Sequence, residues 1–199
     1  MNIQRDIYAE IEPYVDHPEA IVITGMRRTG KTTLLHFMYE KVGHDNKLFL
    51  DLENTLNRKY FEEEDYARIK FNLEVLGLDF KNKAVLFLDE IQFIKNLPSI
   101  VKYLSDHYDV KFFLTGSSSF YLKNLFSESL AGRKYIFELF PLNFNEFLRL
   151  KGEQIRVPST SKNISEAIFK TFDTLYDEFL KFGGFPGVVA KENFEEKKK

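Results

Sequence analysis

The 199-residue chain has no cysteine, no tryptophan and no long apolar run. Without cysteine it can form neither a disulfide nor a thiolate zinc site. No segment approaches the about 20 apolar residues that a membrane-spanning helix needs, and the opening residues MNIQRD lack the apolar stretch of a signal peptide. The four histidines do not have the spacing of metal ligands: His17, His36, His44 and His107. These absences favour a cytoplasmic protein without a membrane partner.

The charge balance gives no sign of a polyanionic partner. Twenty-eight basic and 30 acidic residues leave a formal net charge of −2, so the whole chain does not attract nucleic acid or an anionic membrane. A nucleic-acid partner would need a local basic patch, and the sequence does not decide this point. The length suits one domain with a substantial core and a small appendage.

A phosphate-binding loop is present within ITGMRRTGKTTLL at residues 23–35. Gly25-x-x-x-x-Gly30-Lys31-Thr32 is a P-loop, in which glycines let backbone N–H groups surround nucleotide phosphates. Lys31 would reach the outer phosphates, and the Thr32 hydroxyl would bind Mg²⁺. A flexible Gly/Arg loop without a ligand is the alternative. The expected nucleotide-binding residues are Gly25, Met26, Arg27, Arg28, Thr29, Gly30, Lys31, Thr32 and Thr33.

The flanking residues provide the structural context that this loop requires. Ala20–Thr24 is an apolar, β-branched run typical of a buried strand. Downstream, apolar residues recur with helical spacing until Gly43: Leu35, Met38, Tyr39 and Val42. The loop therefore lies between a strand and a helix, and the positive end of the helix dipole would favour an anion there.

A second motif, AVLFLDEIQ at residues 84–92, predicts a buried strand that ends in two acids. Such a strand carries the acids to the carboxyl edge of a parallel sheet, beside the P-loop. Asp89 would hold Mg²⁺ through water, and Glu90 would orient and deprotonate the attacking water. The alternatives are plain strand-end charges or a helix-capping role, and Asp89 is the second candidate for the base.

Two further apolar runs predict strands at residues 47–52 and 110–120. We expect residues 53–65, which follow the first of these runs, to form an exposed connection to the next helix. The run VKFFLTGSSSF ends in a group of hydroxyls. Ser117 is the candidate for a polar sensor of the γ-phosphate or the attacking water, and Thr115 is the next candidate. A turn followed by a helix cap is the alternative.

The segment LAGRKYIFEL at residues 130–139 predicts a fifth strand, with Arg133 in the loop before it. An arginine there could stabilise the charge that develops on the γ-phosphoryl group, in its own subunit or in a neighbour's. A solvated surface charge is the alternative.

Six ordered motifs resemble one family: GMRRTGKTTLL, LFLDEIQ, LTGSSS, LAGR, LFPLNFNEFL and GGFPGVV. They look like the archaeal and bacterial AAA-type ATPases that are often followed by a carboxyl-terminal domain of unknown function. The resemblance implies an AAA-like P-loop NTPase fold of class α/β: a three-layer α/β/α arrangement with a parallel five-stranded sheet ordered 5-1-4-3-2. It also implies Mg-ATP binding and hydrolysis and strengthens the case for Arg133. Arg27 occupies a position where this family commonly carries arginine, although support of the loop is an equal alternative.

The carboxyl-terminal part predicts a small helical lid. We expect an ATPase core at residues 1–140, a helical lid at 141–190 and a charged tail without a core-forming pattern at 191–199. Asn143 and Glu146 form a capping-box pattern. One apolar face of a longer helix, ended by Gly183-Gly184, would pack as core: Ile168, Phe172, Leu175, Phe179 and Phe182.

Three functions are compatible with these motifs. The first is an ATPase whose hydrolysis drives or times a conformational change. The second is a slow nucleotide-dependent switch that recruits a partner, and the third is a small-molecule kinase. The expected ligands are ATP or ADP and Mg²⁺; a homo-oligomer, a separate carboxyl-terminal domain and a protein partner are further options.

Overall fold

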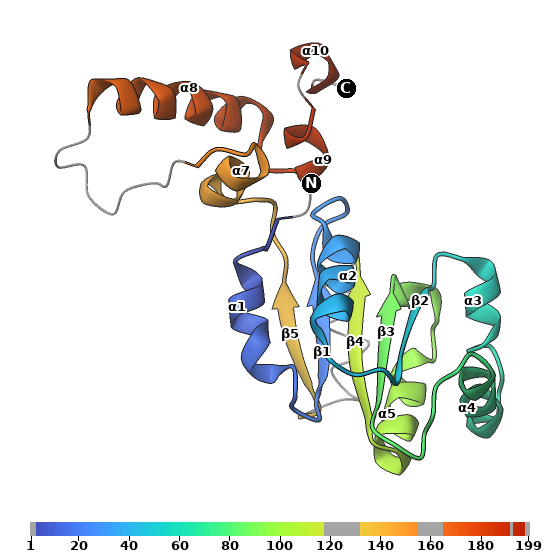
Figure 1. Ribbon diagram of the computed structural model, residues 1–199. Helices are drawn as coiled ribbons and strands as arrows, with labels where there is room; N and C mark the ends of the chain where they lie inside the picture. Colours follow the sequence, from blue (N-terminus) through green and yellow to red (C-terminus); the bar gives the residue numbers. More distant parts are fainter. Residues whose placement is uncertain (1–2, 118–131, 155–164, 192, 198–199) are drawn as a thin grey trace. The chain divides into compact units, whose positions relative to one another are not determined.

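The computed structural model describes residues 3–117, 132–154, 165–191 and 193–197 (Figure 1). Its contacts divide the chain into two compact units. We call Ile7–Arg27 with Lys31–Leu139 the sheet unit, and Met1–Asp6 with Arg28–Gly30 and Phe140–Lys199 the helical unit. The partition into a core, a lid and a tail at residues 140 and 190 stays a prediction.

The sheet unit contains five parallel strands in the order β2-β3-β4-β1-β5, which confirms the expected order 5-1-4-3-2. The three central strands are buried along their whole length, as their continuous apolar runs predict, whereas the two edge strands are partly exposed. The strands are β1 (Ala20–Thr24), β2 (Lys47–Asp51), β3 (Ala84–Asp89), β4 (Val110–Gly116) and β5 (Lys134–Glu138).

Helices cover both faces of this sheet, so the three-layer α/β/α class is confirmed (Figure 1). Because successive side chains of a strand point to opposite faces, each central strand supplies both cores. Ile21 and Ile23 of β1 pack with α1 (Ile7–Ile11) and α2 (Lys31–Lys41). Val22, on the other face, belongs to the core formed with α4 (Tyr66–Val75) and α5 (Leu97–His107).

The connection at residues 53–65 is mostly exposed, as the sequence predicted, although it is not without structure. It contains a short helix, α3 (Thr55–Lys59), whose first turn is capped by the Asn54 side chain. Phe61, two residues beyond the helix, is completely buried. Asp65 caps α4 by accepting a hydrogen bond from the backbone N–H of Ala67. The polar composition of the segment therefore reflects helix capping as well as solvation.

In the described part of the sheet unit, two single-turn 3-10 helices lie in the remaining connections. The first, η1 (Glu12–Tyr14), continues directly from α1, with Pro13 in its first turn. The second, η2 (Ile91–Phe93), follows immediately after the acidic end of β3. It turns the chain directly after Asp89, the predicted metal ligand, and Glu90, the predicted base.

Among its described residues, the helical unit contains α7 (Phe144–Leu150), α8 (Glu166–Phe182), α9 (Pro186–Val189) and α10 (Phe194–Lys197). The capping box at the start of α7 is confirmed, because Asn143 and Glu146 each accept the other's backbone N–H. Its small core is formed by Leu142, Phe147, Leu148, Leu175 and Val189.

The apolar stripe of α8 is buried only in part. Leu175 is buried, Phe172 and Phe179 are partly buried, and Ile168 at the start of the helix is exposed. Near the chain end, Lys197 of α10 is buried and pairs with Glu178 of α8, so the predicted charged tail includes a short ordered helix. None of the helices that the structure describes has the length and apolar character needed to cross a membrane.

Candidate functional site

The P-loop begins at Gly25, directly after β1. Its φ of +144° lies in a region that residues with a side chain rarely adopt. A Cβ atom built on Gly25 would lie well inside contact distance of the Leu139 carbonyl oxygen. Leu139 itself donates its backbone N–H to the Thr24 carbonyl at 2.7 Å. Glycine is therefore required here both by the backbone conformation and by the close approach of a second segment.

Lys31, the first residue of α2, is only 4% exposed. Its Nζ donates hydrogen bonds to the carbonyl oxygens of Gly25 at 3.1 Å and Met26 at 2.8 Å. Burial lowers the pKa of Lys31, the charges of Glu90 and Asp89 act in the opposite direction, and the charge of Arg27 lowers the pKa further. The P-loop lysine and the acidic pair therefore share one electrostatic environment.

The other loop residues of the sheet unit, together with Arg28, are exposed. Thr32 and Thr33 are in the first turn of α2 and present their side chains to solvent, as do Met26 and Arg27. Arg28 has φ +66°, a left-handed conformation that is uncommon for a residue with a side chain. The exposed side chains thus include the hydroxyls of Thr32 and Thr33 and the charges of Arg27 and Arg28.

Within the helical unit, the last two loop positions are Thr29 and Gly30. Thr29 is buried, and its carbonyl oxygen accepts a hydrogen bond of 2.7 Å from Nη1 of Arg5. Gly30 has φ +96°, again a conformation suited to glycine.

The acidic pair lies at the carboxyl end of β3, as predicted. Asp89 is 2% exposed, and its Oδ1 accepts hydrogen bonds from the Thr115 hydroxyl and, at 3.1 Å, from the Glu90 backbone N–H. Glu90 has φ +54°, so the chain makes a left-handed turn at this residue. Left-handed non-glycine residues of this kind concentrate at functional sites, where the surrounding structure imposes them.

The Glu90 carboxylate is held by two side chains. Ser117 Oγ donates to Glu90, lying 3.0 Å from Oε1 and 2.9 Å from Oε2. Gln92 Nε2 donates to Oε2 of Glu90, and Gln92 Oε1 accepts the Ser117 backbone N–H at 3.4 Å. The structure therefore brings Ser117 to the proposed base, while Thr115 contacts the proposed metal-binding acid.

Gln92 was not identified from the sequence. Its position two residues beyond Glu90 gave no signal by itself, because side chains two positions apart on a strand share a face but lie too far apart for a direct hydrogen bond. The 3-10 turn η2 brings it back toward Glu90. The additional hydroxyls Ser118 and Ser119, and residues 130–131 of the LAGR motif, lie outside the described residues.

Arg133 lies at the amino-terminal ends of the strands, whereas the P-loop and the acidic pair lie at their carboxyl ends. Its backbone carbonyl accepts from the Ala20 N–H at 2.9 Å, which places it at the amino-terminal ends of β1 and β5. The five-residue length of β1, roughly 16 Å at about 3.3 Å per residue, separates this end from the P-loop. Its side chain pairs with Asp106 of α5. Within its own subunit Arg133 does not lie beside the phosphate loop, and action on a neighbouring subunit stays a prediction.

These features define a class of protein. A P-loop follows the strand β1, an acidic strand end lies two strands away, and β4 between them presents hydroxyls at the same edge. The Thr32 hydroxyl and the Asp89 carboxylate are oxygen donors of the kind that Mg²⁺ prefers, so the residues present fit this ion. The fold and the edge together are those of a P-loop NTPase.

Comparison with known proteins identifies the family within this class. Residues 17–148 match the family model described as AAA domain, and the chain belongs to that family. It is 32% identical over 200 residues to an uncharacterized protein of Methanocaldococcus jannaschii, covering 98% of this chain and 41% of that protein. An uncharacterized protein of Haemophilus influenzae is 30% identical over 176 residues, covering 86% and 40%. The chain thus spans about two fifths of the length of these relatives.

A solved structure supports the fold independently of sequence. The structure of PCH-2 from C. elegans superposes with a TM-score of 0.58, covering 89% of this chain and 54% of that one. At 14% sequence identity, this likeness concerns the fold alone.

Proposed function

We propose that this chain binds ATP with Mg²⁺ and hydrolyses it, and that hydrolysis drives or times a conformational change. One observation supports hydrolysis most directly: the Glu90 carboxylate is fixed by Ser117 and Gln92 at the strand end whose charges act on Lys31. A carboxylate oriented in this way can position a water molecule and accept its proton.

Nucleotide binding would depend on the loop and on the first turn of α2. The Lys31 ammonium would donate to the outer phosphates in place of the Gly25 and Met26 carbonyls that it now contacts. Thr32 and Asp89 would hold Mg²⁺, which when bound neutralises charge on the phosphates. The amino terminus of α2 adds its favourable dipole.

For the proton-accepting step, Glu90 is better placed than Asp89. Asp89 is almost completely buried, and its Oδ1 already accepts from Thr115 and from the Glu90 backbone. Glu90 is partly exposed at the same edge, so a water molecule can approach the carboxylate that Ser117 and Gln92 orient. We therefore assign the general-base role to Glu90 and an orienting role to Ser117.

A slow nucleotide-dependent switch is the second candidate. The relatives extend over more than twice the length that this chain covers, so residues elsewhere in such proteins could receive the conformational signal. Slow turnover combined with tight nucleotide binding would favour this function over an ATPase that cycles continuously.

Glu90→Gln provides the decisive test. The amide keeps the size of the side chain but cannot accept a proton, so Mg-ATP should bind nearly normally while phosphate release falls by about 100-fold or more. Glu62→Gln, at an exposed acid between α3 and α4, is the matched control and should behave as wild type. The assay is phosphate release with and without small hydroxyl acceptors.

Equal hydrolysis by wild type and Glu90→Gln would remove the base role from Glu90. Phosphate transfer to an added acceptor in place of water would indicate a kinase. Wild-type protein that binds no ATP would refute the proposed function altogether.

A further inference from the structure

Arg5 of the helical unit is a buried arginine with acceptors on several sides; it is 8% exposed. Its Nε and Nη2 donate to Glu146 Oε1 at 2.9 Å and Oε2 at 3.3 Å, forming a two-point ion pair. Nη2 also donates to the Phe140 carbonyl at 2.8 Å, and Nη1 donates to the Thr29 carbonyl at 2.7 Å. One guanidinium therefore joins the chain start, the P-loop and the segment before α7.

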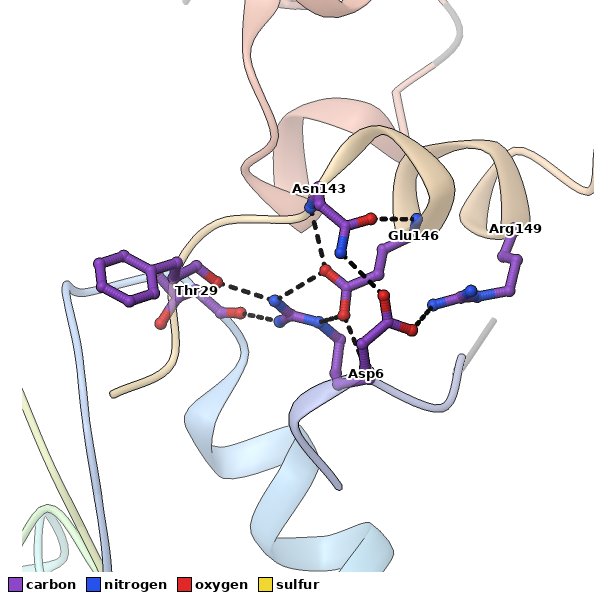
Figure 2. A network of polar contacts seen from close by, with 7 residues as sticks. Asp6, Thr29, Asn143, Glu146 and Arg149 are labelled. Atoms are coloured by element: carbon purple, nitrogen blue, oxygen red, sulfur yellow. Dashed lines mark hydrogen bonds and ion pairs between the residues drawn. The ribbon is translucent and has the colours of Figure 1, made fainter. Parts of the chain in front are cut away.

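Glu146 is itself fixed, so it can hold Arg5 in one orientation. Its Oε1 accepts the Asp6 backbone N–H at 2.8 Å, and its Oε2 accepts the Asn143 backbone N–H at 3.0 Å within the capping box of α7 (Figure 2). Glu146 as a whole is 3% exposed. A carboxylate held by backbone donors and paired with a planar guanidinium has little freedom to turn.

The contact with Thr29 determines the direction of a P-loop peptide group. The Thr29 carbonyl and the Gly30 N–H belong to the same planar trans peptide and point in opposite directions. Arg28 and Gly30, on either side of Thr29, have φ values of +66° and +96°, so the chain turns sharply on both sides of this residue. Holding the carbonyl on Arg5 therefore directs the Gly30 N–H away from Arg5.

We propose that Arg5 is a positioning residue for nucleotide binding, which fixes the Thr29–Gly30 peptide so that its N–H is preorganised to donate to a phosphate. This inference rests on the proposed function, since it assumes that the loop binds ATP. Through Glu146, the orientation of the loop peptide depends on the start of α7. Nucleotide affinity and the order of that helix are then thermodynamically linked, and each changes the other by the same factor.

The expected kinetic effect follows from preorganisation. Without the Arg5 contact, the loop peptide occupies its binding-competent orientation for only part of the time, and the apparent affinity falls by that fraction. Saturating ATP selects the competent orientation again. Loss of the contact should therefore raise KM for ATP by about tenfold and leave kcat within about twofold of wild type.

The experiment must separate this effect from simple destabilisation. Removing Arg5 alone leaves the Glu146 carboxylate buried without its partner and risks unfolding the unit. The principal variant is therefore Arg5→Met combined with Glu146→Gln, because glutamine retains the capping-box acceptor and the pair becomes neutral. Glu146→Gln alone keeps the Arg5 guanidinium, and Arg149→Gln removes only the ion pair with Asp6. KM, kcat and melting temperature are measured for each.

Amide hydrogen exchange of residues 25–33 supplies a readout that needs no nucleotide. The double variant should exchange faster than wild type in this loop by about tenfold, Arg149→Gln should match wild type, and Glu146→Gln should lie between them. In wild type, ATP should slow exchange at the start of α7, and the double variant should lose that protection.

An unchanged KM and unchanged loop exchange in the folded double variant would overturn the inference while leaving the proposed function intact. A KM that rises equally in Arg149→Gln would also overturn it, because a general loss of stability would then be sufficient. If wild type and every variant bind no ATP, the proposed function fails first, and the inference, which rests on it, fails with it.

Discussion

A buried lysine lies at each end of the parallel strands: Lys31 at the carboxyl ends, which we call the carboxyl edge, and Lys111 at the amino ends, which we call the amino edge. The two lysines have different surroundings. At the carboxyl edge, Lys31 contacts two carbonyls of its own loop and is influenced by Glu90 and Asp89. At the amino edge, Lys111 is 3% exposed and donates to the carbonyls of Tyr14, His17 and Glu19 at 2.9, 2.7 and 2.6 Å.

This difference is the one we expect between a phosphate-binding lysine and a structural one. All three donors of the Lys111 ammonium have backbone acceptors, so this residue joins the segment before β1 to the start of β4. Lys31 instead lies near two acids and donates to two loop carbonyls. A phosphate oxygen could take the place of these carbonyls as the acceptor. Burial lowers the pKa of both lysines, which shows that a lowered pKa alone does not identify a functional site.

The largest effect is expected at the carboxyl edge. Lys31→Ala removes the ammonium that the P-loop directs at the outer phosphates, so ATP binding should become undetectable by calorimetry and hydrolysis should cease. Lys41→Ala, an exposed lysine at the end of the same helix, is the control. Normal ATP affinity in Lys31→Ala would mean that the loop is not a nucleotide site.

A smaller effect on turnover is expected from Ser117, which contacts the proposed base Glu90. Ser117→Ala removes the hydroxyl that lies 3.0 and 2.9 Å from the Glu90 carboxylate oxygens, so kcat should fall on the order of tenfold through misplacement of the base. Thr115→Ser keeps a hydroxyl beside Asp89 and should remain close to wild type. Steady-state phosphate release measures both, and a Ser117→Ala variant with full kcat would assign Ser117 to helix capping or a turn.

At the amino edge, substitution of Lys111 should change the stability of the fold and the pH dependence of that stability, and not catalysis. Burial lowers the pKa of Lys111 to about 8. Because this folded-state pKa is below the unfolded value, the unfolded chain binds more protons between about pH 8 and pH 10.5, and stability from this group rises with pH across that window. Lys111→Met lacks this gain while leaving three carbonyls without their donor.

Urea unfolding at pH 7.5 and pH 9.5 measures that prediction. The free energy of unfolding of wild type, relative to Lys111→Met, should increase by on the order of 1 kcal/mol between the two values. Parallel profiles would show that the ammonium does not titrate in this range. An NMR titration of the Lys111 ε-position should have its midpoint near pH 8.

The smallest effect is expected from Arg133, whose side chain is 49% exposed beside Asp106. In dilute protein, Arg133→Ala should leave both ATP affinity and turnover unchanged, because this residue lies at the amino edge of its own sheet. Turnover per subunit is then measured at increasing protein concentration. A loss of about 10³-fold that excess Lys31→Ala subunits restore would instead show that Arg133 acts on a neighbouring subunit.

Features determined by local pattern could be predicted from the sequence. The buried strands, the P-loop context and the capping box depend on residues a few positions apart, and the family motifs added the strand order. Arg5, by contrast, meets Glu146 across 141 positions, and no local pattern indicated this pair. The same limit applies to Lys111, whose acceptors belong to a distant turn, and to Gln92, which depends on a left-handed Glu90.

Gly25 limits which substitutions this sequence can accept. Its φ of +144° and the Leu139 carbonyl beside it exclude any side chain, whereas Gly30 is restricted mainly by its φ of +96°, with no atom outside its own neighbours closer than 3.7 Å to an added Cβ. A saturation library selected for folded protein should therefore tolerate some replacements at Gly30 and none at Gly25. Leu139 immediately precedes the residues of the helical unit. A compensating change for a Gly25 variant would therefore have to move the Leu139 backbone itself.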